Sequence, residues 1–214
     1  MKKVRERESK IKYTRIGDKE DLVIVGIGDA SYKVDDKAVG GVSLFLANSE
    51  LTQASPIYWK SKQIDWVCHS SKDAETMNMT RLVDDATFTA RQLELMLYGD
   101  YKKRIPVRLF SDSECYLEYI ASSKQVVNKS LRMMVWELKD KLLDGEVLSY
   151  AWLPTEHMWA DVLTKEMKMP VALERVLTEN VMTLPKTNIN EVKAFVSEVQ
   201  MENIRNRAVK EEDF

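Results

Sequence analysis

The sequence predicts an α/β protein with a mixed sheet, and three observations support this fold class. Residues 22–28 form a nearly unbroken apolar run, which is typical of a strand buried on both faces of a sheet. Residues 74–97 carry apolar side chains at steps of three and four, the spacing of a long helix with one buried stripe. The order of the predicted elements, βββαβααβα, begins with three strands on short connections, which favours an antiparallel start to the sheet.

Capping and turn residues set the expected boundaries of these elements. Ser70 or Ser71 can cap the start of the long helix, and Gly99 can end it. A turn is predicted at Gly40-Gly41, before the second strand. The expected strands span 11–14, 22–29, 42–46, 57–59, 107–111 and 147–153, and the expected helices span 71–98, 115–122, 129–143, 156–167, 171–182 and 190–208.

The composition of the 214 residues narrows the classes of protein that fit. A hydrophobic fraction of 44% beside 31% charged residues provides material for a core and excludes a disordered chain. No window approaches about 18 uncharged apolar residues, so we expect no membrane span. The 32 basic and 34 acidic residues argue against a strongly basic nucleic-acid-binding protein but are compatible with a nuclease. Two cysteines, Cys68 and Cys115, make no disulfide framework, so we expect a reducing, cytoplasmic compartment.

Four acidic residues fall where a shared site is expected. Asp29 ends the predicted first strand, and Asp112 ends the strand after the long helix. If these strands are parallel neighbours, both carboxylates project into one crevice outside the strand ends, where ligand sites of open α/β sheets lie. Glu75 stands on the apolar stripe near the start of the long helix, where a buried carboxylate is costly unless it is compensated. Asp161, on the helix after the last strand, is a fourth candidate.

Clustered carboxylates indicate a site for divalent cations. Their hard oxygen ligands suit Mg²⁺ or Mn²⁺, ions that also coordinate substrate phosphates. Two such ions can activate a water and stabilise the leaving oxygen in phosphodiester hydrolysis. Each acid also has a plainer interpretation, since an aspartate at a strand end often forms a turn and Glu75 could pair with a lysine. Their joint placement favours the metal site.

Short segments around these acids follow one another along the chain. They are Gly28–Tyr32, Ser55–Gln63, His69–Glu75, Leu109–Asp112, Leu153–Glu156 and Trp159–Lys165. In this order and at compatible spacing, they resemble the ribonuclease H domain of copia/Ty1-type (LTR) retrotransposon Pol polyproteins, which also carry a reverse transcriptase. Leu109–Asp112 matches the strand that ends in the family's CDN motif, and the last two segments match its PTE…ADILTK ending. The resemblance covers about residues 11–168.

The resemblance implies a fold and a division of the chain. The family's ribonuclease H-like fold is a mixed five-stranded sheet flanked by helices on both faces. We therefore expect a charged lead from the reverse transcriptase connection at 1–20, the ribonuclease H-like domain at 21–168, and a helical C-terminal extension at 169–214. Within the cytoplasm, the resemblance would place such a domain in virus-like particles.

The resemblance also implies an activity and its residues. The family's catalytic, metal-binding acids fall on Asp29, Glu75, Asp112 and Asp161. With two Mg²⁺ or Mn²⁺ ions, Asp29 would bridge both, Glu75 and Asp112 would hold one, and Asp161 would hold the other. The implied reaction is cleavage of the RNA strand of an RNA/DNA hybrid, leaving 3′-hydroxyl and 5′-phosphate ends. The implied partners are the hybrid and the reverse transcriptase domain of the same polyprotein.

Substrate contacts and departures from the family leave an alternative open. Lys60 and Lys62 could bind phosphates of the hybrid, or they could simply protect an edge strand from aggregation. Ser113, a further candidate substrate contact, stands where the family has an asparagine. Ser31 and Ser130 replace the second aspartate of its DAD motif and the histidine of its TKH motif. The alternative is a catalytically inactive module that binds nucleic acid or another protein.

Overall fold

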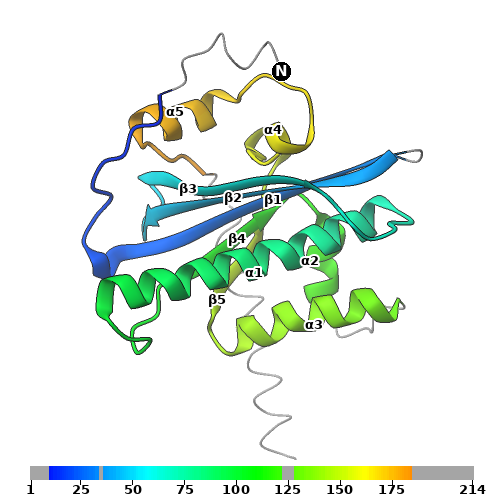
Figure 1. The fold of residues 1–214 in the computed structure, drawn as a ribbon, viewed down its shortest axis with the longest axis horizontal. Coiled ribbons are helices and arrows are strands. Elements are labelled where there is room, and N and C mark those ends of the chain that lie inside the picture. Colours follow the sequence, from blue (N-terminus) through cyan, green and yellow to red (C-terminus); the bar gives the residue numbers. More distant parts are fainter. Residues whose placement is uncertain (1–9, 34–35, 122–127, 185–214) are drawn as a thin grey trace, which may run out of the picture.

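The structure, a computed structural model, describes residues 10–33, 36–121 and 128–184. Its strands are β1 (Leu22–Lys33), β2 (Asp36–Asn48), β3 (Ala54–Gln63), β4 (Val107–Ser111) and β5 (Val147–Trp152). They form one five-stranded sheet in the order β3-β2-β1-β4-β5 (Figure 1). β1, β2 and β3 pair antiparallel, whereas β4 runs parallel to β1 and β5 runs parallel to β4. The predicted mixed sheet is thereby confirmed.

Helices cover both faces of this sheet. They are α1 (Ser71–Tyr98), α2 (Glu114–Ala121), α3 (Lys129–Leu143), α4 (Asp161–Thr164) and α5 (Val171–Glu179), with short 3₁₀ turns η2 (Lys19–Asp21) and η3 (Thr155–His157). α1 packs along one face with α2 and α3 on the same side, whereas α4 and α5 lie on the opposite face (Figure 1). This arrangement confirms the mixed five-stranded sheet with helices on both faces that the resemblance implies.

Helix α1 begins and ends where its capping residues predict. The Ser70 side chain accepts a hydrogen bond from the Asp73 backbone N–H and so caps the start of the helix. Gly99 follows the last residue with a φ of 76°, in the left-handed region that favours glycine. Its N–H donates to the Leu95 carbonyl oxygen and satisfies a carbonyl of the last turn. The capped first turns of α1 carry Glu75, so the helix start also places that carboxylate.

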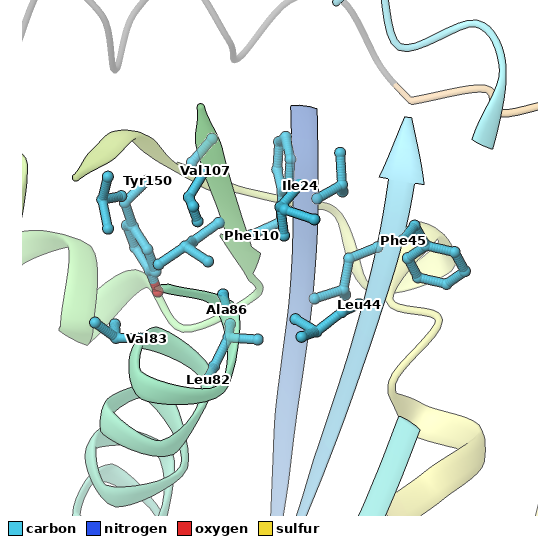
Figure 2. Packing of buried hydrophobic residues seen from close by; sticks show 14 of the residues in the cluster. Ile24, Leu44, Phe45, Leu82, Val83, Ala86, Val107, Phe110 and Tyr150 are labelled. Carbon is cyan, nitrogen blue, oxygen red and sulfur yellow. The ribbon is translucent and has the colours of Figure 1, made fainter. Parts of the chain in front are cut away.

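The hydrophobic core fills both sides of β1 and β2. On the α1 side, Leu82 of α1, Ile24 of β1 and Leu44 of β2 belong to one cluster, and all three are fully buried (Figure 2). On the opposite side, Phe45 packs edge-to-face against Trp159, with ring centroids 5.5 Å apart. Burial on both faces explains the apolar run that predicted β1.

The predicted turn at Gly40-Gly41 is wrong, because both glycines lie inside β2. The strand passes there between Asn78 of α1 and the segment that leads into α4. A Cβ built on Gly40 would overlap Asn78 Oδ1, and one on Gly41 would lie 3.0 Å from the Ala160 carbonyl oxygen. Glycine is therefore required by close approach of the two helical segments rather than by a turn.

We expect Gly41→Ala to destabilise the protein by about 1 to 3 kcal/mol. The added methyl would press on the Ala160 carbonyl and the Leu163 side chain, so α4 would have to move away from the sheet. Urea unfolding followed by tryptophan fluorescence measures the change. Gly17→Ala is the matched control and should stay within about 0.5 kcal/mol of wild type, because a Cβ there meets only Asp21, at an ordinary 3.6 Å. Equal losses in both variants would contradict the close packing of α4 on β2.

Two other predicted elements differ from the structure. Residues 11–14 form no strand, and the Lys12 N–H donates instead to the Leu177 carbonyl oxygen of α5. The single helix predicted over 156–167 is replaced by η3 and the short α4. The reason is that residues 158–161 are all buried, and a surface helix with one apolar stripe cannot bury four residues in succession.

The chain after α4 joins the same core as the sheet. α5 contributes buried side chains to it, and Asn180 at its end is buried too. The Asn180 amide donates to the carbonyl oxygens of Lys12 and Ala54, which ties α5 to the N-terminal lead and to β3. The helix predicted at 190–208 lies outside the described residues. Among the helices that are described, none has both the length and the apolar character to cross a bilayer.

Candidate metal centre

Three carboxylates from distant parts of the sequence meet at one point of the fold. Asp29 belongs to β1, Asp112 directly follows β4, and Asp161 is the first residue of α4. Each offers a carboxylate oxygen, and these oxygens all lie within 4.8 Å of one another. Asp29 and Asp161 are buried, whereas Asp112 is half-buried. We call these three residues the carboxylate cluster.

The strand register explains why Asp29 and Asp112 meet. β1 and β4 are parallel neighbours whose pairing ends at Ile27 opposite Phe110, so the two aspartates lie two residues beyond the last pair. The prediction that β1 ends at Asp29 is wrong, because the strand continues to Lys33 along β2. Asp29 thus lies where β1 extends beyond the end of β4, next to Asp112, which follows β4 directly.

Glu75 lies beside the carboxylate cluster rather than within it. It is half-buried on α1, and its Oε2 accepts a hydrogen bond of 2.5 Å from the Ser113 hydroxyl. The same hydroxyl oxygen accepts from the Tyr116 N–H at 3.3 Å and so caps α2. The charge of Glu75 contributes to raising the pKa of Asp112, after burial and Asp161. Glu75, the fourth predicted acid, is therefore close enough to influence the pKa of Asp112 in the carboxylate cluster.

The carboxylate cluster holds negative charge in surroundings that disfavour it. The pKa of Asp29 is raised from its ordinary 3.8 to about 6, mainly by burial and further by the charges of Asp161 and Asp112. The Thr164 hydroxyl and the Lys165 ammonium act in the opposite direction. Burial, followed by the charge of Asp161, also raises the pKa of Asp112. A bound cation would relieve this cost.

Sequence reasoning did not assign roles to three residues that support the carboxylate cluster. Lys165 Nζ lies 2.8 Å from Asp161 Oδ1 and 3.5 Å from Asp29 Oδ2, and the Thr164 hydroxyl donates to Asp29 Oδ2. The buried Asn78 amide donates to the Asp29 carbonyl oxygen at 2.8 Å. Thr164 and Lys165 belong to the segment that matches the family's ending, and Asn78 is a polar residue one turn after Glu75. These two features of the sequence could have indicated that the three residues lie at the site.

The three residues predicted to contact the substrate, Lys60, Lys62 and Ser113, lie in two different parts of the fold. Lys60 and Lys62 are on β3, the edge strand, which β2 separates from β1. Lys62 is exposed and pairs with Asp65 at 2.6 Å, whereas Lys60 is half-buried. Ser113 is buried against Glu75. Their contact with a substrate stays a prediction.

No protein-family model and no curated protein sequence matches this chain. Among solved structures, it is similar to the N-terminal ribonuclease H domain of a Mycobacterium tuberculosis protein, with 14% identity over 67% of this chain and 91% of that chain and a TM-score of 0.48. It is also similar to LC11-RNase H1 in complex with an RNA/DNA hybrid, with 16% identity, 70% and 99% coverage and a TM-score of 0.46. A foamy viral protease-reverse transcriptase in complex with double-stranded DNA gives 17% identity, 67% and 91% coverage and a TM-score of 0.41.

Proposed function

We propose that this chain is a metal-dependent endonuclease that hydrolyses the RNA strand of RNA/DNA hybrids. One observation carries the proposal: three carboxylates from β1, the end of β4 and α4 have oxygens within 4.8 Å of one another. Three like charges gathered at a partly buried site are expected where a cation neutralises them. A site of oxygen ligands at a strand end, next to solvent, is also suited to a phosphate-bearing substrate.

The residues present fit Mg²⁺ or Mn²⁺. Hard carboxylate oxygens are the ligands these ions prefer. Burial, with smaller contributions from neighbouring carboxylates, raises the pKa of Asp29 and of Asp112, and a bound cation would favour their charged forms. Asp29, Asp112 and Asp161 would hold the ions, and Glu75 would complete the set from the side of α1. When bound, two such ions supply charge neutralisation and activation of water for phosphodiester hydrolysis.

The chain's own residues keep the acids in place for this chemistry. Asn78 fixes the backbone of Asp29 through its carbonyl oxygen and also donates to the Gly41 carbonyl of β2 at 3.0 Å. Ser113 orients Glu75 by a direct hydrogen bond. Asp29 lies on the central strand of the sheet. With Asp112 and Asp161 it would hold the ions, and Glu75 would face them from α1.

The choice of an RNA/DNA hybrid rests on the family resemblance of the sequence. All four acids stand at the family's metal-binding positions, which supports a role in reverse transcription of a retrotransposon, next to the reverse transcriptase domain of the same polyprotein. Lys60 and Lys62 on the edge strand would contact phosphates, which position a duplex without reading its sequence. Recognition of the hybrid would depend on helix shape and 2′-hydroxyls.

Cleavage of a hybrid labelled separately on each strand tests this function. With Mg²⁺ or Mn²⁺, the protein should cut only the RNA strand, leave 3′-hydroxyl ends, and cut neither double-stranded DNA nor double-stranded RNA. Chelation by EDTA should abolish cutting. Cleavage of double-stranded DNA at an equal rate would contradict specificity for hybrids.

An inactive nucleic-acid-binding module is the second candidate, and Ser113 is the observation that favours it. It replaces the family's asparagine, and its hydroxyl is engaged by Glu75. Hybrid binding that weakens steeply with salt, without cutting in either metal, would select this candidate. Absence of any affinity for nucleic acid would select a protein-interaction module instead.

A further inference from the structure

Lys165 places a positive charge inside the carboxylate cluster. It directly follows α4, and its backbone N–H donates to the Asp161 carbonyl oxygen at 2.8 Å. Its side chain folds back over that turn, so that Nζ lies 2.8 Å from Asp161 Oδ1 and 3.5 Å from Asp29 Oδ2. One ammonium group therefore bridges the acids of β1 and α4.

This ammonium and a divalent ion would compete for the same oxygens. At 2.8 Å, Nζ donates a charge-assisted hydrogen bond to Asp161 Oδ1, which occupies one of the lone pairs available to a metal ion. An ion bound between Asp29 and Asp161 would also repel the ammonium at short range. The ammonium and the metal ion therefore compete for these carboxylates.

The Lys165 side chain can leave the carboxylate cluster without disturbing the core. It is 44% exposed, while the carboxylates of Asp29 and Asp161 are 5% and 7% exposed. A long, flexible stem allows the ammonium to turn to solvent while α4 stays in place. The Thr164 hydroxyl, which donates to Asp29 Oδ2, would still hold α4 against β1.

We propose that Lys165 is an internal counter-ion that holds Asp29 and Asp161 together in the metal-free protein and is displaced when a divalent ion binds. The inference rests on the carboxylate cluster being the metal centre proposed above. It makes Lys165 a positioning residue for the metal-free state and a competitor of the metal. Removing its charge should therefore tighten metal binding and loosen the metal-free fold.

Titration with Mn²⁺, followed by the electron paramagnetic resonance of the free ion, tests the inference without measuring activity. Lys165→Gln should bind Mn²⁺ roughly tenfold more tightly than the wild type, a size typical of two coupled binding events. In EDTA, the variant should melt at a lower temperature than the wild type, and Mn²⁺ should raise its melting temperature by more. Lys165→Arg, which keeps the positive charge, should bind Mn²⁺ with an affinity close to that of the wild type.

Lys168→Gln is the matched control, because Lys168 is exposed three residues further along and its substitution removes the same charge. It should leave Mn²⁺ affinity unchanged. Unchanged or weaker Mn²⁺ binding by Lys165→Gln would overturn the inference, including the case in which only hybrid binding is weakened and Lys165 is a phosphate contact. If the wild type binds Mn²⁺ and Lys165→Gln binds it more tightly, but hybrid is not cut, the counter-ion role is supported and the nuclease function fails.

Discussion

Asp112→Asn is expected to lower the rate of hybrid cleavage by about a thousandfold. A metal ligand contributes several kcal/mol of transition-state stabilisation, and each 1.4 kcal/mol corresponds to about a factor of ten in rate. An asparagine has the shape of the aspartate but lacks the charge that holds a divalent ion. Single-turnover cleavage of a hybrid labelled on its RNA strand measures the effect in Mg²⁺ and in Mn²⁺.

The same substitution should leave the fold intact. Burial raises the pKa of Asp112, so the charged form is already disfavoured in the folded protein and its removal costs no stability. Trp152 Nε1 donates to the backbone carbonyl of this residue, a contact that the substitution does not touch. Asp140→Asn, at an exposed position on α3, is the matched control and should cleave at the wild-type rate. If Asp112→Asn cleaves within tenfold of that control, Asp112 is not a metal ligand.

Asp29→Asn is expected to abolish cleavage and, at the same time, to stabilise the metal-free protein. The pKa of Asp29 is about 6 in the folded protein, against an ordinary 3.8. The folded state therefore binds the proton more tightly than the unfolded state, and ionisation of Asp29 lowers stability as the pH rises from about 4 to about 6. Above that range, the loss is complete and amounts to as much as about 3 kcal/mol.

Asparagine carries no charge at any pH, so it removes this loss. In EDTA at pH 7.5, Asp29→Asn should unfold at a higher urea concentration than the wild type, and the difference should shrink as the pH is lowered towards 4. Asp140→Asn should track the wild type across the whole range. A wild type that is more stable than Asp29→Asn at pH 7.5 in EDTA would show that burial of this carboxylate carries no cost.

Much of the fold could be predicted because its signals are local. The apolar run of β1 and the stripe of α1 are visible in the sequence, and capping chemistry gave both ends of α1 correctly. The Gly40-Gly41 pair led to the wrong prediction of a turn. In the sequence alone, a glycine pair in a turn cannot be distinguished from a glycine pair in a strand that packs closely against a helix. The break between η3 and α4 was missed because it depends on burying Trp159 against Phe45, which is a tertiary contact.

The candidate metal centre, like the fold, has features that could be predicted from the sequence and features that could not. Asp29 and Asp112 could be predicted to meet, because both lie at the ends of strands that were expected to be parallel neighbours. Asp161 was added to them as a candidate on the helix after the last strand, and the family resemblance maps it to the same site. The support from Asn78 and Lys165 could not be predicted, because it depends on which face of β1 each helix covers. Asn78 approaches from the α1 side and Lys165 from the α4 side, and no local pattern records that arrangement.

The most direct test of the metal centre is anomalous diffraction from crystals grown with Mn²⁺. The account predicts anomalous density bounded by Asp29, Asp112 and Asp161, with Glu75 facing it from α1 and the Lys165 ammonium moved away from Asp161. Asp112→Asn crystals should lose or weaken that density. Density confined to other surfaces, with Lys165 still bridging Asp29 and Asp161, would contradict the claim that these carboxylates form a metal centre.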